Sequence, residues 1–306
     1  MSSISVIIPA YNAEKYLAEA IESALHQTRP AKEIVVVDDG SSDRTLEVVQ
    51  SFGEKVRIIQ HEANQGVGAA RNTGVAASDG DYVAFLDADD KWLPEHLENL
   101  AGLLDMWPET GLAFCQIEFV GRKSGMWPER IDGFLEPRAA FFDMLRNIVC
   151  VPSAMMVRRR IHEHIGGFDA ATYFAGRRRV QAEDLDYVIR LSRAAQLVAS
   201  PRTTVQYRWH QGQSSVRRPE QVVLSFVYRL RILDALNREK TPAEEIELAV
   251  DRIQRCWEEH IEQFWVQRNG RGLWQMVRFG LRKGILRKST WHYVPRVLLC
   301  LVEAGG

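Results

Sequence analysis

The sequence predicts an α/β fold built on a doubly wound, mostly parallel sheet. Within the first 92 residues, four short apolar runs alternate with three segments whose apolar residues recur at helical spacing. Polar residues, several of them aspartates, follow these runs directly. Strand and helix in strict alternation are typical of a parallel sheet covered by helices. Ligands of such sheets bind at the carboxyl ends of the strands.

The elements of this first part follow from hydrophobic periodicity. Strands are predicted where apolar runs are short and bounded by turn residues, at 4–8, 33–37, 56–59 and 81–86. Helices are predicted where apolar residues lie three or four positions apart, at 17–27, 46–52 and 66–77. We expect Pro9 to stop the first strand and Ser42 or Asp43 to cap the second helix.

Beyond residue 93 the alternation is less regular. Helices are predicted at 94–106, 138–148, 158–165 and 184–192, and strands at 112–119, 153–157, 196–199 and 203–208. A loop with many Gly and Pro residues should precede residue 138, and residues 166–169 form a turn. From residue 219 onward the pattern is helical, with breaks near 241–242, 269–272 and 288–290.

Composition bounds the classes of function. The chain has 306 residues and a net charge of −1, but residues 1–100 hold 17 acids against 8 bases, and residues 264–306 hold 8 bases against 1 acid. The excess of acids in the N-terminal 100 residues argues against nucleic acid as the main ligand. It permits a phosphate ligand only if a metal supplies positive charge.

Three features concern location. The four cysteines are widely spaced, as expected of buried thiols in a reducing compartment. The first residues lead directly into a strand without a secretory pattern, and the longest apolar run, 297–302, is too short to span a bilayer. We expect a cytoplasmic protein, either free or peripheral on the inner face of the membrane.

Three carboxylates, Asp87, Asp89 and Asp90, follow the fourth strand within four residues. In an extended chain Asp87 and Asp89 face one way and Asp90 the other. Neighbouring carboxylates repel, and a cation relieves the repulsion. Magnesium typically takes one or two protein carboxylates together with substrate phosphates. A divalent metal site is therefore expected, with an acidic turn before the next helix as the alternative; Asp90 is expected to cap that helix.

Two further strand ends carry residues suited to a nucleotide. Tyr11, after Pro9 and Ala10, could stack on a base whose edge is read by the backbone, or be a half-buried turn residue. Asp38 ends the second strand, where an acid commonly bonds ribose or base. Helix capping is the alternative for Asp38.

The segment 66–71, GVGAAR, is not a dinucleotide fingerprint. Its third position holds Arg71 instead of Gly or Ala, and it follows the third strand instead of the first. The small residues more plausibly let this helix pack closely on the sheet. Arg71 could then reach a diphosphate, or make a surface salt bridge.

Four motifs stand in order: SVIIPAYN at 5–12, VVDDGSSD at 36–43, NQGVGAARNTG at 64–74 and FLDADD at 85–90. With them the chain resembles the inverting family 2 glycosyltransferases of the A-type nucleotide-sugar fold. The resemblance continues more loosely through 166–169, 183–184 and 207–210. It implies a catalytic domain over 1–215, with a Rossmann-like nucleotide-sugar-binding half (1–92) and an acceptor half (93–215), followed by a helical, basic C-terminal extension (216–306).

The resemblance also implies roles for individual residues. Those matched to the nucleoside, usually uridine, are Pro9, Ala10, Tyr11 and Asp38, and Arg71 matches a diphosphate contact. Asp87-Ala88-Asp89 matches the metal motif, with Asp87 near the ribose and Asp89 on the Mn²⁺ or Mg²⁺ ion.

Asp184 matches the catalytic base of the family, with Glu183 as the second candidate. The structural alternative for both is that they are acids at a helix N-terminus, where the helix dipole stabilises negative charge. His210 is expected to join the metal or the phosphates, or to be a structural histidine. The arginines at 177–179 could attract an anionic acceptor or form a solvated loop.

The implied reaction moves a sugar from a UDP-sugar to a glycan, lipid-linked or protein acceptor, in cell-surface polysaccharide or glycoconjugate synthesis. A sugar-nucleotide nucleotidyltransferase is one alternative, although the basic Gly-rich loop usual near its N-terminus is missing here. A catalytically inactive nucleotide- or carbohydrate-binding scaffold is another. The basic, aromatic tail from 264 to 296 suits an anionic membrane surface or packing on the protein, including self-association.

Overall fold

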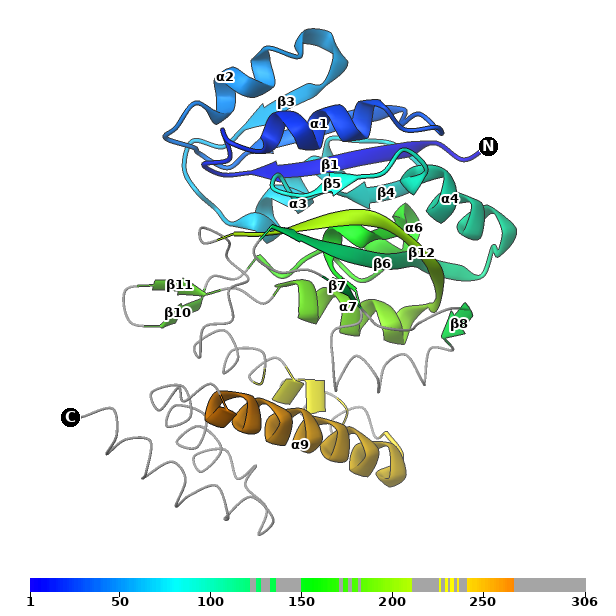
Figure 1. Cartoon of the computed structure of the whole chain (residues 1–306). Helices are drawn as coiled ribbons and strands as arrows, with labels where there is room; N and C mark the ends of the chain where they lie inside the picture. Colours follow the sequence, from blue (N-terminus) through cyan, green and yellow to red (C-terminus); the bar gives the residue numbers. More distant parts are fainter. Residues whose placement is uncertain are drawn as a thin grey trace, which may run out of the picture. The chain divides into compact units, whose positions relative to one another are not determined.

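In the computed structural model, the residues that the structure describes are 1–121, 125–127, 133–135, 150–170, 173–175, 178–180, 183–210 and 241–266, with six isolated positions between 226 and 236. The chain forms two compact units. The first contains residues 1–141, 148–171 and 186–212, and the second contains 142–147, 172–185 and 213–306. Each unit is described by itself, and Figure 1 labels their elements.

A central sheet organises the first unit, with the strand order β3-β2-β1-β4-β9-β6-β12-β5 (Figure 1). The first four are parallel: β1 (Ile4–Ala10), β2 (Glu33–Asp38), β3 (Arg57–Gln60) and β4 (Tyr82–Phe85). β9 (Met155–Arg158) is antiparallel to both β4 and β6 (Thr110–Gly121), and β12 (Gln196–Trp209) is parallel to β6. The mostly parallel α/β sheet predicted from the sequence is therefore confirmed.

Short antiparallel strands complete the sheet. β5 (Lys91–Trp92) and β8 (Gly133–Leu135) pair with β12, and β7 (Gly125–Trp127) pairs with β6. None of the three was predicted. Each has only two or three residues, too few for a periodic pattern.

Helices cover both faces of the sheet. Val6 and Ile8 of β1 belong to a core that includes residues of α1 (Leu17–Leu25), α2 (Thr45–Gln50) and α4 (His96–Met106). Ile7 points to the other face, toward α3 (Val67–Ala76). Phe85, its partner in β4, contacts His162 of α6 (Arg159–His164) and Tyr187 of α7 (Glu183–Ala194). The sheet is doubly wound, as the alternation predicts.

Three boundaries differ from the predictions. β1 does not stop at Pro9 but continues to Ala10; its pairing with β4 ends at Ile7, so Pro9 needs no N–H donor on that side. Residues 196–199 and 203–208 join into one strand, β12, with register irregularities between Ser200 and Val205. α2 begins after Arg44, and Asp43 accepts a bond from the backbone N of Thr45.

The second unit contains a hairpin and a long helix. β10 (Tyr173–Ala175) pairs antiparallel with β11 (Arg178–Val180), so two of the three arginines at 177–179 lie in a strand, where a loop was one expectation. α9 (Ala243–Val266) begins directly after the predicted break at 241–242. Trp257 of α9 meets Phe226 edge to face, with ring centroids 5.1 Å apart.

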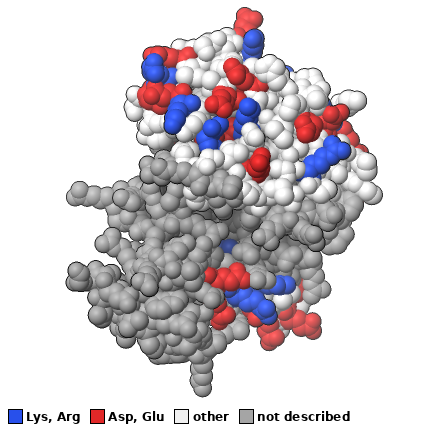
Figure 2. Space-filling model, viewed as in Figure 1, with Lys and Arg blue, Asp and Glu red and all other residues white. Residues whose placement is uncertain are grey.

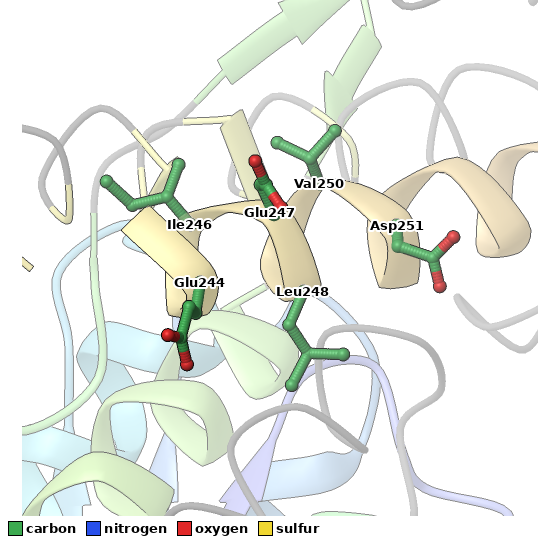
Figure 3. A pocket seen from close by; sticks show the side chains of 6 residues that line it. All are labelled: Glu244, Ile246, Glu247, Leu248, Val250 and Asp251. Atoms are coloured by element: carbon green, nitrogen blue, oxygen red, sulfur yellow. The ribbon is translucent and has the colours of Figure 1, made fainter. Parts of the chain in front are cut away.

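A pocket lies beside the first half of α9, and Figure 3 shows its lining of three carboxylates and three aliphatic side chains: Glu244, Ile246, Glu247, Leu248, Val250 and Asp251. None of these residues was predicted for a site. Among the described helices, none is long and apolar enough to cross a membrane. The predicted helix at 138–148, the breaks near 269–272 and 288–290, and the basic tail beyond Val266 lie outside the described residues.

Figure 2 shows the charges of the described residues on one face of the molecule, where Lys and Arg are interspersed with Asp and Glu. The cysteines follow expectation where they are described. Cys115, Cys150 and Cys256 are buried and form no disulfide among the described residues, and Cys300 lies outside the described residues.

The close packing of α3 on β1 gives a stability prediction. A Cβ atom on Gly74 would lie 2.5 Å from the Cγ2 methyl of Ile7, a buried, branched side chain that cannot easily move. Gly74→Ala should therefore destabilise the protein by about 1–3 kcal/mol, although alanine is the better helix former. Chemical denaturation measures the change.

Gly102 of α4 is the matched control, because a Cβ atom there meets nothing within 4 Å. Gly102→Ala should stabilise the protein by about 0.5–1 kcal/mol. Equal effects of the two substitutions would show that α3 has room to move away from the sheet.

Two buried histidines should make the fold sensitive to acid. Burial lowers the pKa of His96 from 6.5 to about 3, and burial together with Arg159 and Arg190 lowers the pKa of His162 to about 4. The unfolded chain binds these protons near pH 6.5 and the folded chain does not. The free energy of unfolding should therefore fall as pH decreases from about 6.5 toward 4, by up to about 1.4 kcal/mol per pH unit for each histidine.

Urea titrations across this range check the effect. His162→Gln should flatten the pH dependence, whereas the same change at the exposed His26 should leave it as in wild type. A wild-type slope in His162→Gln would contradict the assignment.

Candidate active site

The carboxyl ends of β1, β2 and β4 meet at one edge of the sheet. The parallel register pairs Ala10 with Asp38 on one side of β1 and Ile7 with Phe85 on the other. The strand order reverses between β1 and β4, because β2 and β3 extend the sheet in one direction and β4 in the other. Such a reversal leaves the crevice where open α/β sheets bind ligands.

Asp38 stands at this edge with half of its carboxylate unmatched. Its side chain is fully buried, and Oδ1 accepts a hydrogen bond from the backbone N of Ser41 at 3.1 Å. Within the part of the chain that the structure describes, Oδ2 is buried and has no partner. A buried acceptor without a donor costs about 1–3 kcal/mol, so this oxygen is suited to a donor group on a ligand.

The residues predicted beside Asp38 line the same edge. Pro9 and Ala10 are buried in β1, where the carbonyl of Ala10 accepts a bond from the backbone N of Asp39 at 2.8 Å. Tyr11 follows with 52% of its surface exposed. An exposed ring next to a buried acceptor fits a planar ligand with an N–H edge.

Arg71 and Asp87 form an ion pair, with Nη2 of Arg71 2.6 Å from Oδ1 of Asp87. The Arg71 side chain is 3% exposed and that of Asp87 25%. Arg71 is therefore buried, and the surface salt bridge that the sequence left open does not describe it. Ala88, the middle residue of the motif, is also buried.

Asp89 contacts His210, the residue that follows the end of β12. Nε2 of His210 lies 3.0 Å from Oδ2 of Asp89. Both side chains are about a quarter exposed, 27% for Asp89 and 24% for His210. Burial and the neighbouring Asp87 carboxylate raise the pKa of Asp89, and His210 opposes the shift. The ring of Tyr16 lies beside His210, with centroids 5.0 Å apart.

Asp90 does not cap the following helix, as the sequence suggested. Glu95 precedes α4, and Asp90 instead holds two distant segments. Its Oδ2 accepts a bond from the hydroxyl of Ser153 at 2.6 Å, and its Oδ1 accepts one from the backbone N of Arg208 at 3.0 Å. Burial is the main cause that raises the pKa of Asp90 well above its usual value, and the charges of Asp89 and Asp87 raise it further.

Arg208 was missed by the sequence analysis, although it lies in the segment 207–210. Its Nε donates to the carbonyl of Asp89 at 3.0 Å, and its Nη2 to Glu19 of α1 at 2.9 Å. Its guanidinium lies 4.6 Å from the ring centroid of Tyr16. One side chain thus ties the metal-motif turn and the end of β12 to α1.

Asp39 was also missed, although it directly follows Asp38. Its carboxylate accepts three bonds: from Nδ1 of His61 at 2.7 Å, and from the backbone N of Gln65 and of Gly66 at 2.8 and 2.7 Å. His61 also lies 3.0 Å from the hydroxyl of Thr73. Asp39 therefore fixes the loop that leads into α3, the helix that carries Arg71.

A divalent ion fits this edge as a ligand shared with a substrate. In the described ranges, no three His, Cys, Asp or Glu side chains converge into a closed metal site. Asp87 and Asp89 are adjacent, partly exposed carboxylates, and the pKa of Asp89 is raised partly by the charge of Asp87. This pattern suits Mg²⁺ or Mn²⁺ bound by one or two carboxylates and completed by phosphate oxygens.

Glu183 and Asp184, the predicted acceptor-side acids, open α7 and belong to the second unit. Glu183 is buried and Asp184 is partly exposed. Oδ1 of Asp184 accepts a bond from the backbone N of Leu185 at 2.7 Å, which satisfies one N–H of the first helical turn.

The bonds at Asp39 give a testable prediction. Asp39→Asn keeps the size of the side chain but leaves one acceptor oxygen for three donors. The protein should lose about 1–3 kcal/mol of stability for a buried donor left unpaired. Denaturation measures the loss, and faster amide exchange at Gln65 and Gly66 would locate it.

Asp79→Asn is the control, since Asp79 forms an exposed pair with Lys32, and it should change stability by no more than about 0.5 kcal/mol. Unchanged exchange at Gln65 and Gly66 in Asp39→Asn would refute the role of Asp39.

Comparison with known proteins points to one family. Residues 5–166 match the family model described as Glycosyl transferase family 2. A "putative teichuronic acid biosynthesis glycosyltransferase" of Bacillus subtilis is 41% identical over 114 residues, 36% of this chain and 44% of the relative. An uncharacterized glycosyltransferase of Rickettsia felis is 30% identical over 219 residues, 69% of this chain and 35% of the relative. The chain thus spans less than half the length of these curated relatives.

Solved structures agree on the fold. TarS of S. aureus, residues 1–349 in complex with UDP, superposes with a TM-score of 0.66 at 20% identity, covering 96% of this chain and 87% of that one. The mannosyltransferase PcManGT of Pyrobaculum calidifontis, in complex with GDP-Man and Mn²⁺, gives 0.59 at 20% identity, covering 99% and 80%. At these identities the likeness concerns the A-type glycosyltransferase fold alone. The match over more than half of the sequence is the stronger finding, and by it this chain belongs to glycosyl transferase family 2.

Proposed function

We propose that the protein transfers a sugar from a UDP-sugar to an acceptor hydroxyl with inversion at the anomeric carbon. One observation carries the proposal: the Oδ2 of Asp38, which has no partner among the described residues, lies at the sheet edge to which the Arg71–Asp87 and Asp89–His210 pairs also belong. The edge thus offers an acceptor for a base or ribose and charged groups for a diphosphate. Family membership supplies the reaction class.

The donor would bind along this edge in three parts. Tyr11 stacks on the uracil ring, the backbone at Pro9 and Ala10 contacts its edge, and Asp38 accepts from the nucleoside. Arg71, held at Asp87, neutralises diphosphate charge, and Asp87 lies near the ribose. A TarS structure in complex with UDP-GlcNAc supports a donor of this class at a similar fold.

A divalent ion, Mn²⁺ or Mg²⁺, fits the exposed side of the same turn. The residues that would hold it are Asp89 first, then Asp87 and His210. When bound, the ion would act as a Lewis acid on the departing diphosphate. His210 would also stabilise the ionised carboxylate of Asp89 before donor binding, because its Nε2 already faces that carboxylate and opposes the rise of the Asp89 pKa.

Asp184 is the proposed base, with Glu183 as the second candidate because it is more buried. The acceptor oxygen attacks the anomeric carbon from the face opposite the diphosphate, and the carbon–oxygen bond to the diphosphate breaks. The acceptor proton passes to the carboxylate of Asp184. Inverting displacement passes through an oxocarbenium-like centre, as in glycoside hydrolysis.

The acceptor is proposed to be a cell-envelope or exported glycan, or a lipid-linked precursor of one. The teichuronic acid relative supports this class. The buried cysteines, which form no disulfide among the described residues, favour the expected cytoplasmic location. The division into a catalytic domain (1–215) and a basic helical extension (216–306) remains part of the proposal, as does membrane contact or self-association through that extension.

Thermal-shift measurements with UDP test the donor site. UDP with Mn²⁺ should raise the melting temperature of wild type, and Mn²⁺ should add nothing to the effect of UDP in Asp89→Ala. Asp38→Ala should weaken UDP binding about 5- to 150-fold, the effect of losing a bond worth about 1–3 kcal/mol. Absence of any metal-dependent stabilisation of wild type by UDP compounds would refute the proposal.

Transfer itself is tested at the base. Asp184→Asn should bind UDP with wild-type affinity and lose at least about 10²–10⁴-fold in kcat, the usual contribution of a general base. Glu183→Gln is the matched comparison and should retain more activity. A larger loss in Glu183→Gln would exchange the two roles, and UDP binding without hydrolysis or transfer in wild type would favour an inactive scaffold.

A further inference from the structure

Phe168 lies beneath the guanidinium of Arg71. The Cζ atom of Arg71 is 5.1 Å from the centroid of the Phe168 ring. The same guanidinium reaches Asp87 through Nη2 at 2.6 Å. Arg71 and Phe168 are each 3% exposed, so the contact is desolvated. A cation over an aromatic face is worth more in such surroundings than at the surface.

Two other aromatic rings fix the ring plane of Phe168. Tyr187 stacks on it with centroids 3.9 Å apart and an angle of 13° between the rings. Phe85 of β4 meets it edge to face, at 5.1 Å and 89°. His162 also lies near it, with centroids 6.2 Å apart. The rotation of the ring is therefore restricted by its neighbours in the first unit, and the ring also contacts Arg71.

The backbone of Phe168 is fixed by the residue next to Arg71. The side-chain Nδ2 of Asn72 donates to the carbonyl of Phe168 at 2.8 Å, and the backbone N of Phe168 donates to Oδ1 of Asn72 at 2.9 Å. Two consecutive residues of α3 thus hold Phe168, one at its ring and one at its backbone. This arrangement ties both the ring and the backbone of Phe168 to α3.

The turn before Phe168 is shaped for this contact. Gly167 has φ +71°, and a Cβ atom there would lie 2.6 Å from Oδ1 of Asn72. Arg190 of α7 donates to the carbonyls of Ile165 and Gly167, at 2.6 and 2.8 Å. The turn is therefore held from two helices, and only glycine at position 167 leaves room for the side chain of Asn72.

We propose that Phe168 is a positioning residue for the donor diphosphate: its ring holds the guanidinium of Arg71 against Asp87, in the orientation that receives the diphosphate. This inference rests on the proposed function of Arg71. Phe168 does not touch the donor. Its effect should appear only with ligands that carry a diphosphate, because a ligand that ends at the nucleoside does not use Arg71.

The test compares Phe168→Leu with Phe85→Leu. Both remove one ring from the same aromatic cluster, and only Phe168 stacks on Arg71. With Mn²⁺ present, Phe168→Leu should weaken UDP binding about 3- to 30-fold, the range expected for a buried cation–π contact, and leave uridine binding unchanged. The KM for the donor should rise more than kcat falls. Phe168→Tyr keeps the ring and should recover most of the affinity.

A double-mutant cycle separates positioning from general loss of packing. In an Arg71→Ala background, Phe168→Leu should have no further effect on UDP affinity. Phe85→Leu, at a ring that contacts the Phe168 ring but not Arg71, should weaken UDP binding less than Phe168→Leu does. Additive effects of Phe168→Leu and Arg71→Ala, or equal loss of UDP and uridine binding, would overturn the inference.

Wild type distinguishes the two levels of the proposal. If wild type does not bind UDP, the proposed function fails. If wild type binds UDP and Phe168→Leu binds it equally well, only the role of Phe168 fails. Melting temperatures of all variants are measured in parallel. If Phe168→Leu does not fold, the Phe168→Tyr and Phe168→Trp pair decides: UDP affinity that changes together with uridine affinity contradicts the inference.

Discussion

At the carboxylate of Asp90, three segments that are far apart in the sequence come together. The hydroxyl of Ser153 and the backbone N of Arg208 both donate to it, and the Ser153 oxygen accepts a bond from the backbone N of Asp87. A carboxylate without water is tolerated only if its oxygens are hydrogen bonded. Its burial therefore keeps both donors in place. As a result, Asp87 and Asp89 leave the turn in fixed directions, one toward Arg71 and the other toward His210.

A similar pairing of acids occurs at two strand ends along the sheet edge where the donor is proposed to bind. At the ends of β2 and β4, one acid has its carboxylate oxygens hydrogen bonded within the protein, whereas its neighbour keeps an unmatched oxygen or a partly exposed carboxylate. Asp39 is saturated by three donors, whereas Asp38 keeps one oxygen unmatched among the described residues. Asp90 is likewise bound, whereas Asp89 is partly exposed. Sites built on rigid elements and held by such supporting bonds lose less freedom when a ligand binds.

Local patterns were sufficient for the first four strands and their helices, because each element has its own periodicity. They were insufficient wherever a partner lies far along the chain. Asp90 was predicted to be a helix cap, since its donors are 63 and 118 residues away and leave no trace in the adjacent sequence. Arg208 stood in a segment that was recognised, but its three contacts are with Asp89 of the motif turn, Glu19 of α1 and Tyr16, all of them far away along the chain. Asp38, Asp87 and Asp89 could be predicted as site residues because they follow the ends of strands. That Oδ2 of Asp38 has no partner among the described residues is visible only in the structure.

The strand order also has a consequence for biosynthesis. β4 lies between β1 and β9, and β9 is translated about 70 residues after it, at residues 155–158. Until β9 emerges from the ribosome, β4 is an unpaired edge strand of the four-stranded N-terminal sheet, although all of its residues are buried in the folded protein. Such edges bind other chains readily, particularly during slow translation of an incompletely folded domain. The nascent chain should therefore be most prone to misassembly, and most in need of chaperones, between synthesis of residue 85 and residue 158.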